Sequence, residues 1–326
     1  MNIITKIISY ITLIILILTF NFFLPRVMPG DPLSFLTGSP TMDMPIVLDE
    51  EMRAELLAYY GLDKPLLQQF ADYMLNLLHG NLGWSIYLNA PVSDALIGAL
   101  KWTLLLVGTA TAIYIVLGIV LGAISAWNRG SKRDVELLTF VLSISSFPSF
   151  FLGMLFIILL GVNLSFFPIS GAQTPFAEYS TPFEAAWDTF RHLLLPAMTL
   201  VIAHIGGIYL LMRNSMLNVL GEDYILTARA KGLSEWYIMH KHAMKNALLP
   251  IITMIALRVG FLISGTIFVE TVFAYPGVGR LLYDAVTYRD YPLLQGAFLI
   301  ITLVIITANF VADMTYAHLD PRVKHE

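Results

Sequence analysis

The sequence lacks cysteine altogether and is poor in charged residues. Without cysteine, the chain has no disulfides, zinc–thiolate sites or thiol-based catalysis. Only 13% of its 326 residues are charged, whereas a soluble domain usually carries about 25%. Hydrophobic residues make up 57%. Because such a chain has too little charge to cover a normal water-facing surface, we expect a membrane protein.

Other signals of function are also missing. The net charge of −4 gives no sign of nucleic-acid binding. The sequence has no Gly-x-x-x-x-Gly-Lys-Ser/Thr loop for nucleotide phosphates, no His-Glu-x-x-His and no Gly-x-Ser-x-Gly motif. His240 and His242 are two residues apart and would lie on different helix faces. We therefore predict no catalytic residue and no metal site, and an enzyme is disfavoured.

Six long apolar runs are present. An α-helix needs roughly 20 apolar residues to cross about 30 Å of hydrocarbon. The runs cover residues 7–25, 102–128, 137–162, 193–212, 248–269 and 293–312. The first is followed by no small-x-small cleavage site, so we interpret it as a retained span rather than a signal peptide. The continuous hydrophobicity disfavours a barrel. We predict an all-α integral membrane protein with six transmembrane helices.

The placement of Lys and Arg predicts the orientation. The short connection after span two and the one after span four are rich in basic residues, whereas the connection after span three has none until Arg191. We therefore expect both termini in the cytoplasm of a multi-pass protein of the cell (inner, cytoplasmic) membrane. The predicted parts are a first span (1–28), an extracytoplasmic loop subdomain (29–101), a five-helix core (102–315) and a cytoplasmic tail (316–326).

The first outer connection contains two predicted helices, over residues 49–60 and 66–79, which end at Gly61 and Gly80. Both have amphipathic patterns. Two interpretations stay open for this subdomain: a small cap lying on the membrane surface, or a platform for an external partner.

The inner connection over residues 222–250 predicts a helix, a tight turn and a second helix. Residues 223–231 are good helix formers, and Gly232 suits the left-handed residue that ends a helix. Ser234 suits the next N-cap. Residues 236–239 would expose a Trp, a Tyr, an Ile and a Met to water, which calls for a cover. The hairpin could be purely structural or a docking element; a DNA-binding helix-turn-helix is disfavoured between two spans.

This stretch resembles the permease subunits of ATP-binding-cassette (ABC) importers, in particular the first-subunit type of the dipeptide, oligopeptide and nickel family. The match lies in residues 227–234 and 242–250, which resemble that family's version of the EAA loop. Further fragments occur in order at residues 29–32, 60–65, 80–85, 167–171, 192–197, 269–273, 276–280, 289–292 and 319–323. Leu226 and Thr227 depart from the general EAA pattern, as do His242 and Lys245, which weakens any transfer from sugar importers.

The resemblance implies a type I ABC importer fold and an assembly. A second, similar permease would complete the pathway, two cytoplasmic ATPase subunits would bind Mg-ATP, and an external solute-binding protein would deliver the cargo; this chain itself needs no cofactor. The residues implied to couple to the ATPase are Ala228, Arg229, Ala230, Gly232, Leu233, Ser234, Glu235 and Trp236. The expected cargo is di- or oligopeptides, with nickel chelates or oligosaccharides as alternatives. A stand-alone secondary transporter is the alternative from another class.

Single residues within the spans offer weaker hypotheses. Arg258 lies in span five, and either lines the pathway or reaches the membrane interface. Glu270, at the outer end of that span, either lines the pathway or gate or is simply solvated. His204 is expected in an interhelical hydrogen bond. Three glycines of span two are expected to permit close helix packing: Gly108, Gly118 and Gly122.

Overall fold

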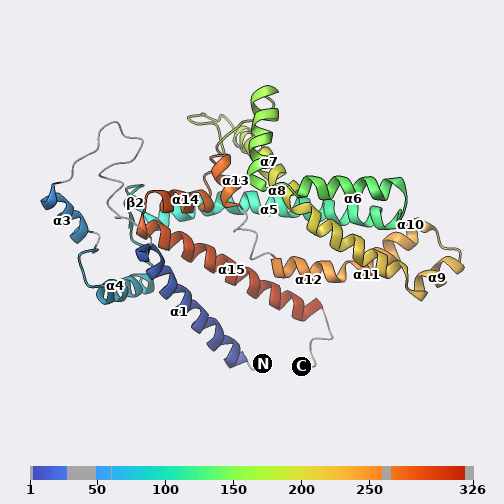
Figure 1. The fold of residues 1–326 in the computed structure, drawn as a ribbon, viewed down its shortest axis with the longest axis horizontal. Helices are drawn as coiled ribbons and strands as arrows, with labels where there is room; N and C mark the ends of the chain where they lie inside the picture. Colours follow the sequence, from blue (N-terminus) through green and yellow to red (C-terminus); the bar gives the residue numbers. More distant parts are fainter. Residues whose placement is uncertain (1–2, 28–48, 60, 259–265, 320–326) are drawn as a thin grey trace. The chain divides into compact units, whose positions relative to one another are not determined.

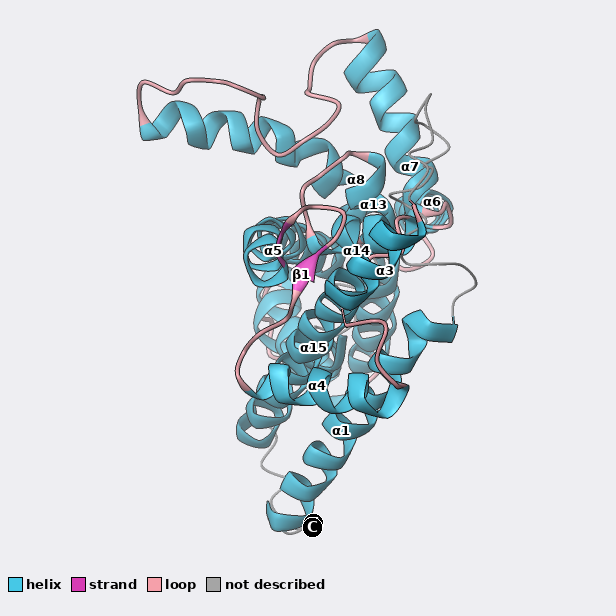
Figure 2. Ribbon diagram, turned by 90° about the vertical axis from the view of Figure 1, so that its left-hand side faces the viewer, coloured by secondary structure: helices cyan, strands magenta, loops and turns pink. Residues whose placement is uncertain are grey.

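The computed structural model describes residues 3–27, 49–59, 61–258 and 266–319. These ranges are mainly helical, as Figures 1 and 2 show, and contain one antiparallel strand pair, β1 (Trp84–Ser85) with β2 (Ala90–Pro91). The helices that precede residue 146 are α1 (Ile3–Val27), α3 (Glu50–Tyr59), α4 (Leu66–Leu78), α5 (Val92–Trp127) and α6 (Lys132–Ser145). The helices that follow it are α7 (Ser149–Phe156), η1 (Ile157–Asn163), α8 (Pro182–Leu220), α9 (Asp223–Ala230), α10 (Glu235–Tyr237), η2 (Ile238–Met244), α11 (Lys245–Ala247), α12 (Leu249–Arg258), α13 (Ile267–Val272), α14 (Val278–Thr287) and α15 (Tyr291–Leu319).

Three of the described helices are long and apolar enough to cross a membrane: α5, α8 and the first 18 residues of α15. The helices α5 and α8 extend well beyond the apolar runs 102–128 and 193–212. The apolar part of α1, Thr12–Val27, is shorter. The predicted fifth span falls partly on residues 259–265, outside the described residues, so the six-span arrangement stays a prediction.

The predicted third span is not one straight helix. Its residues form α6 and the continuous pair α7–η1, which meet at an angle of 94° and together match one span in length and composition. Pro148 is the N-cap of α7, and the proline ring disfavours the helical conformation for the preceding Phe147. The sequence prediction of an unbroken helix over 137–162 was therefore wrong at this position.

The chain divides into two compact units, which we describe separately: Met1–Lys101 with Gly277–Leu303, and Trp102–Pro276 with Val304–Glu326. In the second unit, α5 packs closely against α8. A Cβ atom on Gly118 would come within 2.8 Å of Ile208, and one on Gly122 within 2.6 Å of the Tyr209 carbonyl oxygen. Two of the three predicted packing glycines are thus confirmed. Gly108 is not confirmed as a third, because no other helix among the described residues comes within 4 Å of the corresponding position there.

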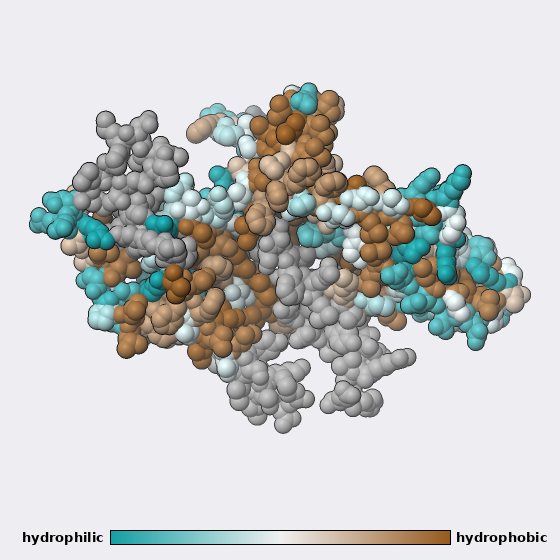
Figure 3. Space-filling view, viewed as in Figure 1, coloured by the Kyte–Doolittle hydropathy of each residue, from teal (hydrophilic) through white to brown (hydrophobic). Residues whose placement is uncertain are grey.

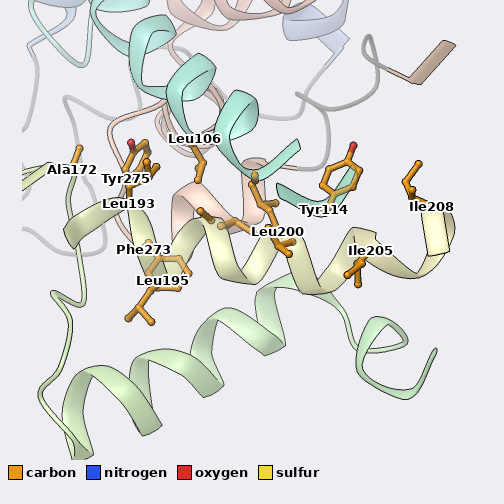
Figure 4. Packing of buried hydrophobic residues seen from close by; sticks show 14 of the residues in the cluster. Leu106, Tyr114, Ala172, Leu193, Leu195, Leu200, Ile205, Ile208, Phe273 and Tyr275 are labelled. Atoms are coloured by element: carbon orange, nitrogen blue, oxygen red, sulfur yellow. The ribbon is translucent and has the colours of Figure 1, made fainter. Parts of the chain in front are cut away.

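The core of the second unit follows α8 along its length. Figure 4 shows Leu195, Leu200 and Ile205 of α8 among the buried side chains of this core. From α5 come Leu106 and Tyr114, and from the chain around α13 come Phe273 and Tyr275. The outward side of α7 is brown, and hence hydrophobic, in Figure 3; its exposed residues include Phe151 and Met154. An apolar surface of this extent fits lipid or another membrane subunit.

The first unit is held by a buried aspartate. One carboxylate oxygen of Asp290 accepts hydrogen bonds from the Ser85 hydroxyl at 2.6 Å and the Tyr87 amide at 2.9 Å. Its other oxygen accepts from the Leu293 amide in the first turn of α15. The two helices predicted over 49–60 and 66–79 are confirmed as α3 and α4 within the described residues. Only α4 has a clear amphipathic pattern, because α3 is exposed along most of its length.

Candidate functional site

The hairpin predicted within residues 222–250 is present. Its first arm is α9. The chain leaves this helix at Gly232, whose φ of +73° is left-handed. The Gly232 amide donates to the Arg229 carbonyl oxygen at 2.9 Å, and the Leu233 amide donates to Ala228 at 3.4 Å. Among the described residues, no neighbouring atom lies within 4 Å of a Cβ placed on Gly232. The glycine is therefore required by the backbone conformation and not by crowding.

The second arm begins where the sequence places its N-cap. The Ser234 hydroxyl accepts a hydrogen bond from the Tyr237 amide at 3.4 Å. The arm then runs through α10, the π-helix η2 and α11 into the start of α12. The sequence predicted a regular second helix, and the π-helical segment is the difference. Because the wider turn places residues five apart on the same side, the packing of this arm differs from that of an α-helix.

One side of the hairpin is buried against α8 and the end of α5. The buried cluster draws on α5, α8, α9, η2, α11 and the first turn of α12: Ala123, Ala126, Met212, Met216, Ile225, Ala228, Ile238, Ala243, Ala247 and Ile251. Two polar contacts add to it: the Ser215 hydroxyl of α8 donates to the Ala247 carbonyl oxygen at 2.8 Å, and the Asn246 amide donates to the Tyr224 hydroxyl at 2.8 Å. The hairpin is thus fixed to the long helix α8.

Ile238 corrects the sequence prediction, which expected this side chain to be exposed with its neighbours. It is 0% exposed and belongs to the buried cluster. The neighbouring Trp236 is 69% exposed, and Tyr237 is 41% exposed. The hairpin therefore turns Ile238 inwards and Trp236 outwards.

The tip presents an exposed surface of mixed character. Leu233, Trp236 and Tyr237 are exposed there, and in Figure 3 hydrophilic and hydrophobic residues are mixed at the end of the second unit that carries α9 and α10. The Trp236 ring stacks on His240 with centroids 4.3 Å apart. Arg229 and Glu235 form an ion pair across the turn at 3.2 Å. Of the eight predicted coupling residues, Ala228 is buried and the other seven are exposed.

A buried charge cluster next to the hairpin was missed by the sequence analysis. Arg213, in α8, forms an ion pair with Asp134 of α6 through Nη2 and Oδ2 at 2.9 Å, and its Nε donates to Oδ1 at 3.0 Å. Ser125 of α5 donates to the same carboxylate, as does the Gly130 amide. Together with Ser125, the ion pair joins the three helices α5, α6 and α8. Its partners are 79 residues apart in the sequence, so no local pattern could have revealed it.

The charge state of this cluster follows from its hydrogen bonds. Asp134 lies ahead of the apolar run that begins at residue 137. The hydrogen bond from Arg213 holds the pKa of Asp134 well below its usual range, against burial, which raises it; Ser125 and the Gly130 amide lower it further. Asp134 is therefore a carboxylate at neutral pH, and Arg213 is its counter-ion.

The candidate pathway residues have different outcomes. Glu270 is fully buried in α13, and its carboxylate accepts a hydrogen bond from the Thr103 hydroxyl of α5 at 2.8 Å. The alternative that Glu270 is simply solvated was therefore wrong, while a role in the pathway stays a prediction. Arg258 ends α12, but its side chain is outside the described residues. His204 is exposed on α8, with its ring centroid 5.9 Å from that of Tyr114. Within the described ranges, no group of three or more His, Cys, Asp or Glu side chains is placed to hold a metal ion.

Long apolar helices with an exposed hairpin fixed to one of them define a membrane transport subunit, and comparison with known proteins agrees. The fold resembles that of a chain in the inward-facing MetNI methionine ABC transporter, with a TM-score of 0.55 and 16% identity over 69% of this chain and 96% of that one. Residues 118–325 match the model of the binding-protein-dependent transport system inner membrane component family. The chain belongs to this family and is a permease subunit of an ABC transporter.

Curated relatives match almost the whole chain. The dipeptide transport system permease protein DppB of Escherichia coli (strain K12) is 38% identical, over 96% of this chain and 94% of the relative. The di/tripeptide transport system permease protein DppB of Pseudomonas aeruginosa (strain UCBPP-PA14) is also 38% identical, over 94% and 93%. The glutathione transport system permease protein GsiC of Escherichia coli O6:H1 is 36% identical over 99% of both chains. The resemblance found in the sequence is thus confirmed at the level of the family.

Proposed function

We propose that this chain forms half of the translocation pathway of an ATP-driven importer for di- or oligopeptides. It would cross the cell membrane six times, with residues 137–162 of the bent pair α6 and α7–η1 as the third span and both termini in the cytoplasm. The hairpin of residues 222–250 would then lie on the cytoplasmic side. Residues 29–101 would form the extracytoplasmic subdomain, 102–315 the core and 316–326 the tail.

The observation that carries this proposal is the division of the hairpin into a fixed side and a free side. Ile238 and Ala228 are buried against α8, whereas Trp236 and Leu233 are exposed at the tip. An exposed aromatic residue on a rigid support is typical of the central anchor of a protein interface. Because the hairpin is packed onto α8, a push on its tip would move that helix with it. The tip therefore suits a cytoplasmic ATPase subunit.

The partners follow from this mechanism. Two ATPase subunits would bind Mg-ATP, and the permease itself would perform no hydrolysis, although the whole complex could be classed as a translocase. A second, similar permease would contact the apolar surfaces that the described helices leave exposed, together with lipid. An extracytoplasmic solute-binding protein would deliver the cargo.

The names of the relatives support peptides as the cargo, because the proteins compared are permeases for dipeptides, di/tripeptides and glutathione. Nickel chelates and oligosaccharides are the alternatives from the sequence analysis. Uptake measurements in vesicles with labelled dipeptide, nickel–histidine complex and trisaccharide would separate the three.

Affinity purification in mild detergent tests the assembly, with a matched pair of variants. We expect the wild-type chain to co-purify with a similar permease and Walker-type ATPases. Trp236→Ala should reduce the recovered ATPase about tenfold or more, since truncating an interface anchor costs about 2 kcal/mol. Trp187→Ala is the control, because Trp187 is also an exposed tryptophan but lies on the first part of α8. A chain recovered alone, which still moves solute in vesicles without ATP, would instead indicate a secondary transporter.

A further inference from the structure

A cavity of about 320 Å³ lies within the first unit, next to the last turn of α1. It is lined by residues of α1, α3 and α4, of the loops on both sides of α4, of the turn after β1 and of the start of α15. Figures 1 and 2 both show α4 beside this end of α1. The proposed transport mechanism gives this cavity no role.

Two buried polar atoms, one on a residue that lines the cavity and one on a residue next to it, have no hydrogen-bond partner among the described residues. One is the side-chain nitrogen Nε2 of Gln295, a cavity-lining residue that is 9% exposed. The other is Oδ1 of the neighbouring Asn21, whose Nδ2 donates to the Gln295 carbonyl oxygen at 2.7 Å. A buried donor without an acceptor is costly. The side-chain N–H groups of Gln295 are therefore available as donors to an acceptor group in the cavity.

The charge of the lining indicates that this acceptor is an anion. The Arg26 guanidinium donates to Oε1 of Gln69 at 2.8 and 3.2 Å and to the Phe22 carbonyl oxygen at 2.7 Å, all of which are neutral groups. Within the described part of the chain, no carboxylate pairs with it. The other cation of the lining, Lys64, is paired with Asp72 at 2.7 Å. The cavity thus has a net positive charge that Arg26 contributes.

The surroundings of the cavity are those of a membrane boundary. The apolar run of α1 ends at Pro25, directly before Arg26. On α4, Leu67 is 83% exposed and Leu78 is 81% exposed, and these residues are eleven apart, which places them on the same face of a helix. An amphipathic helix with leucines on one side and a cationic cavity on the other is suited to the interface between lipid tails and headgroups.

We propose that this cavity binds the phosphate of an anionic phospholipid, with the Arg26 guanidinium and the Gln295 amide as donors and the leucines of α4 against the acyl chains. The binding chemistry is independent of the proposed function. The orientation proposed there would place this lipid in the outer leaflet, and only that placement rests on the proposed function.

Lipid binding to the purified, delipidated complex tests the proposal. The probes are dioleoylphosphatidylglycerol, the zwitterionic dioleoylphosphatidylcholine and inorganic phosphate, with native mass spectrometry and the Tm as readouts. We expect phosphatidylglycerol to be retained and to raise the Tm. Arg26→Gln and Gln295→Met should each raise the apparent Kd for phosphatidylglycerol about tenfold, since the free energy of one hydrogen bond to a charged group corresponds to a change in Kd of about this size. Arg191→Gln is the control: it removes one exposed arginine from the other unit and should leave the apparent Kd for phosphatidylglycerol unchanged.

Gln295→Met separates lipid binding from folding. The change keeps the side-chain volume and removes a donor that has no partner in the described structure, so the lipid-free Tm should not fall. Equal phosphatidylglycerol affinity in Arg26→Gln, Gln295→Met and the wild type would overturn the proposal. It would also be overturned if inorganic phosphate alone raised the Tm as much as the lipid. None of these results depends on whether ATPase subunits co-purify.

Discussion

Two ion pairs of the second unit have similar chemistry but differ in their surroundings. The side chains of Arg213 and Asp134 are only 16% and 5% exposed, whereas those of Arg229 and Glu235 are 45% and 59% exposed. The first pair lies where α5, α6 and α8 meet; the second bridges the turn of the hairpin. Removing one partner of a buried pair leaves an uncompensated charge, while an exposed pair is worth little. The buried pair therefore holds the helices, and the exposed pair is available to a partner.

The largest expected effect is at the buried pair. Asp134→Ala should lower the free energy of unfolding by about 3–5 kcal/mol, because Arg213 loses its counter-ion. Thermal unfolding in detergent would measure the loss. The double variant Asp134→Leu with Arg213→Met is the control and should recover most of it, since neither charge remains. If the double variant were as unstable as the single one, burial of an unpaired charge would not be the cause.

The same pair predicts a pH dependence. The pKa of Asp134 is lower in the folded protein than in the unfolded chain, so its stabilising contribution is complete above the ordinary carboxyl pKa of about 4. The contribution is lost as the pH falls below that value. We expect the difference in Tm between the wild type and Asp134→Asn to be constant from pH 8 to about pH 5 and to shrink at lower pH.

The next effect concerns the turn between the arms of the hairpin. Gly232→Pro should destabilise the hairpin locally by about 3 kcal/mol, because proline cannot adopt a positive φ and removes the amide that donates to Arg229. We expect uptake to fall to background while membrane insertion persists. Gly232→Ala keeps the amide and should cost only about 1–2 kcal/mol. Normal uptake by Gly232→Pro would contradict the docking role of the hairpin.

A smaller effect is expected at the N-cap of the second arm. Ser234→Ala removes the acceptor for the Tyr237 amide and should cost about 1 kcal/mol. Hydrogen exchange of the amides in residues 235–240 would report it as faster local opening. Ser234→Asp, which restores an acceptor, should reverse the change; if it does not, the capping bond is not what holds this turn.

The smallest effect is expected at the exposed pair. Glu235→Gln should change the free energy of unfolding by less than about 1 kcal/mol, and less still at high salt. Its effect on recovery of the ATPase should exceed its effect on the Tm, because the pair lies on the proposed docking surface. A loss of stability as large as that of Asp134→Ala would remove the distinction between the two pairs.

The hairpin was predictable because its signals are local. The left-handed Gly232 and the capping Ser234 each specify the backbone within a few residues, and both were confirmed. The prediction that Gly118 and Gly122 permit close helix packing was likewise correct, because such packing is the usual reason for glycine within a span.

The remaining features depend on tertiary structure. Hydropathy alone did not predict the bend at Pro148, because the charge-free run over residues 137–162 continues across it. The contact of Arg213 with Asp134 needs the arrangement of three helices, and the burial of Ile238 needs both the face of α8 and a π-helical turn. The apolar pattern also could not tell that Gly108, unlike Gly118 and Gly122, has no packing neighbour among the described residues.

The π-helix η2 determines which way the tip of the hairpin faces. Ile238 and Ala243 are five residues apart and both buried, whereas Ala243, Ala247 and Ile251 follow at steps of four. In an α-helix each residue turns the chain by about 100°, so a step of five would place Ile238 on a different face. Deleting one residue of η2 would restore α-helical spacing and rotate Trp236 by about that angle relative to α8. The direction in which the docking surface faces therefore depends on the number of residues in η2, as well as on the residues at the tip.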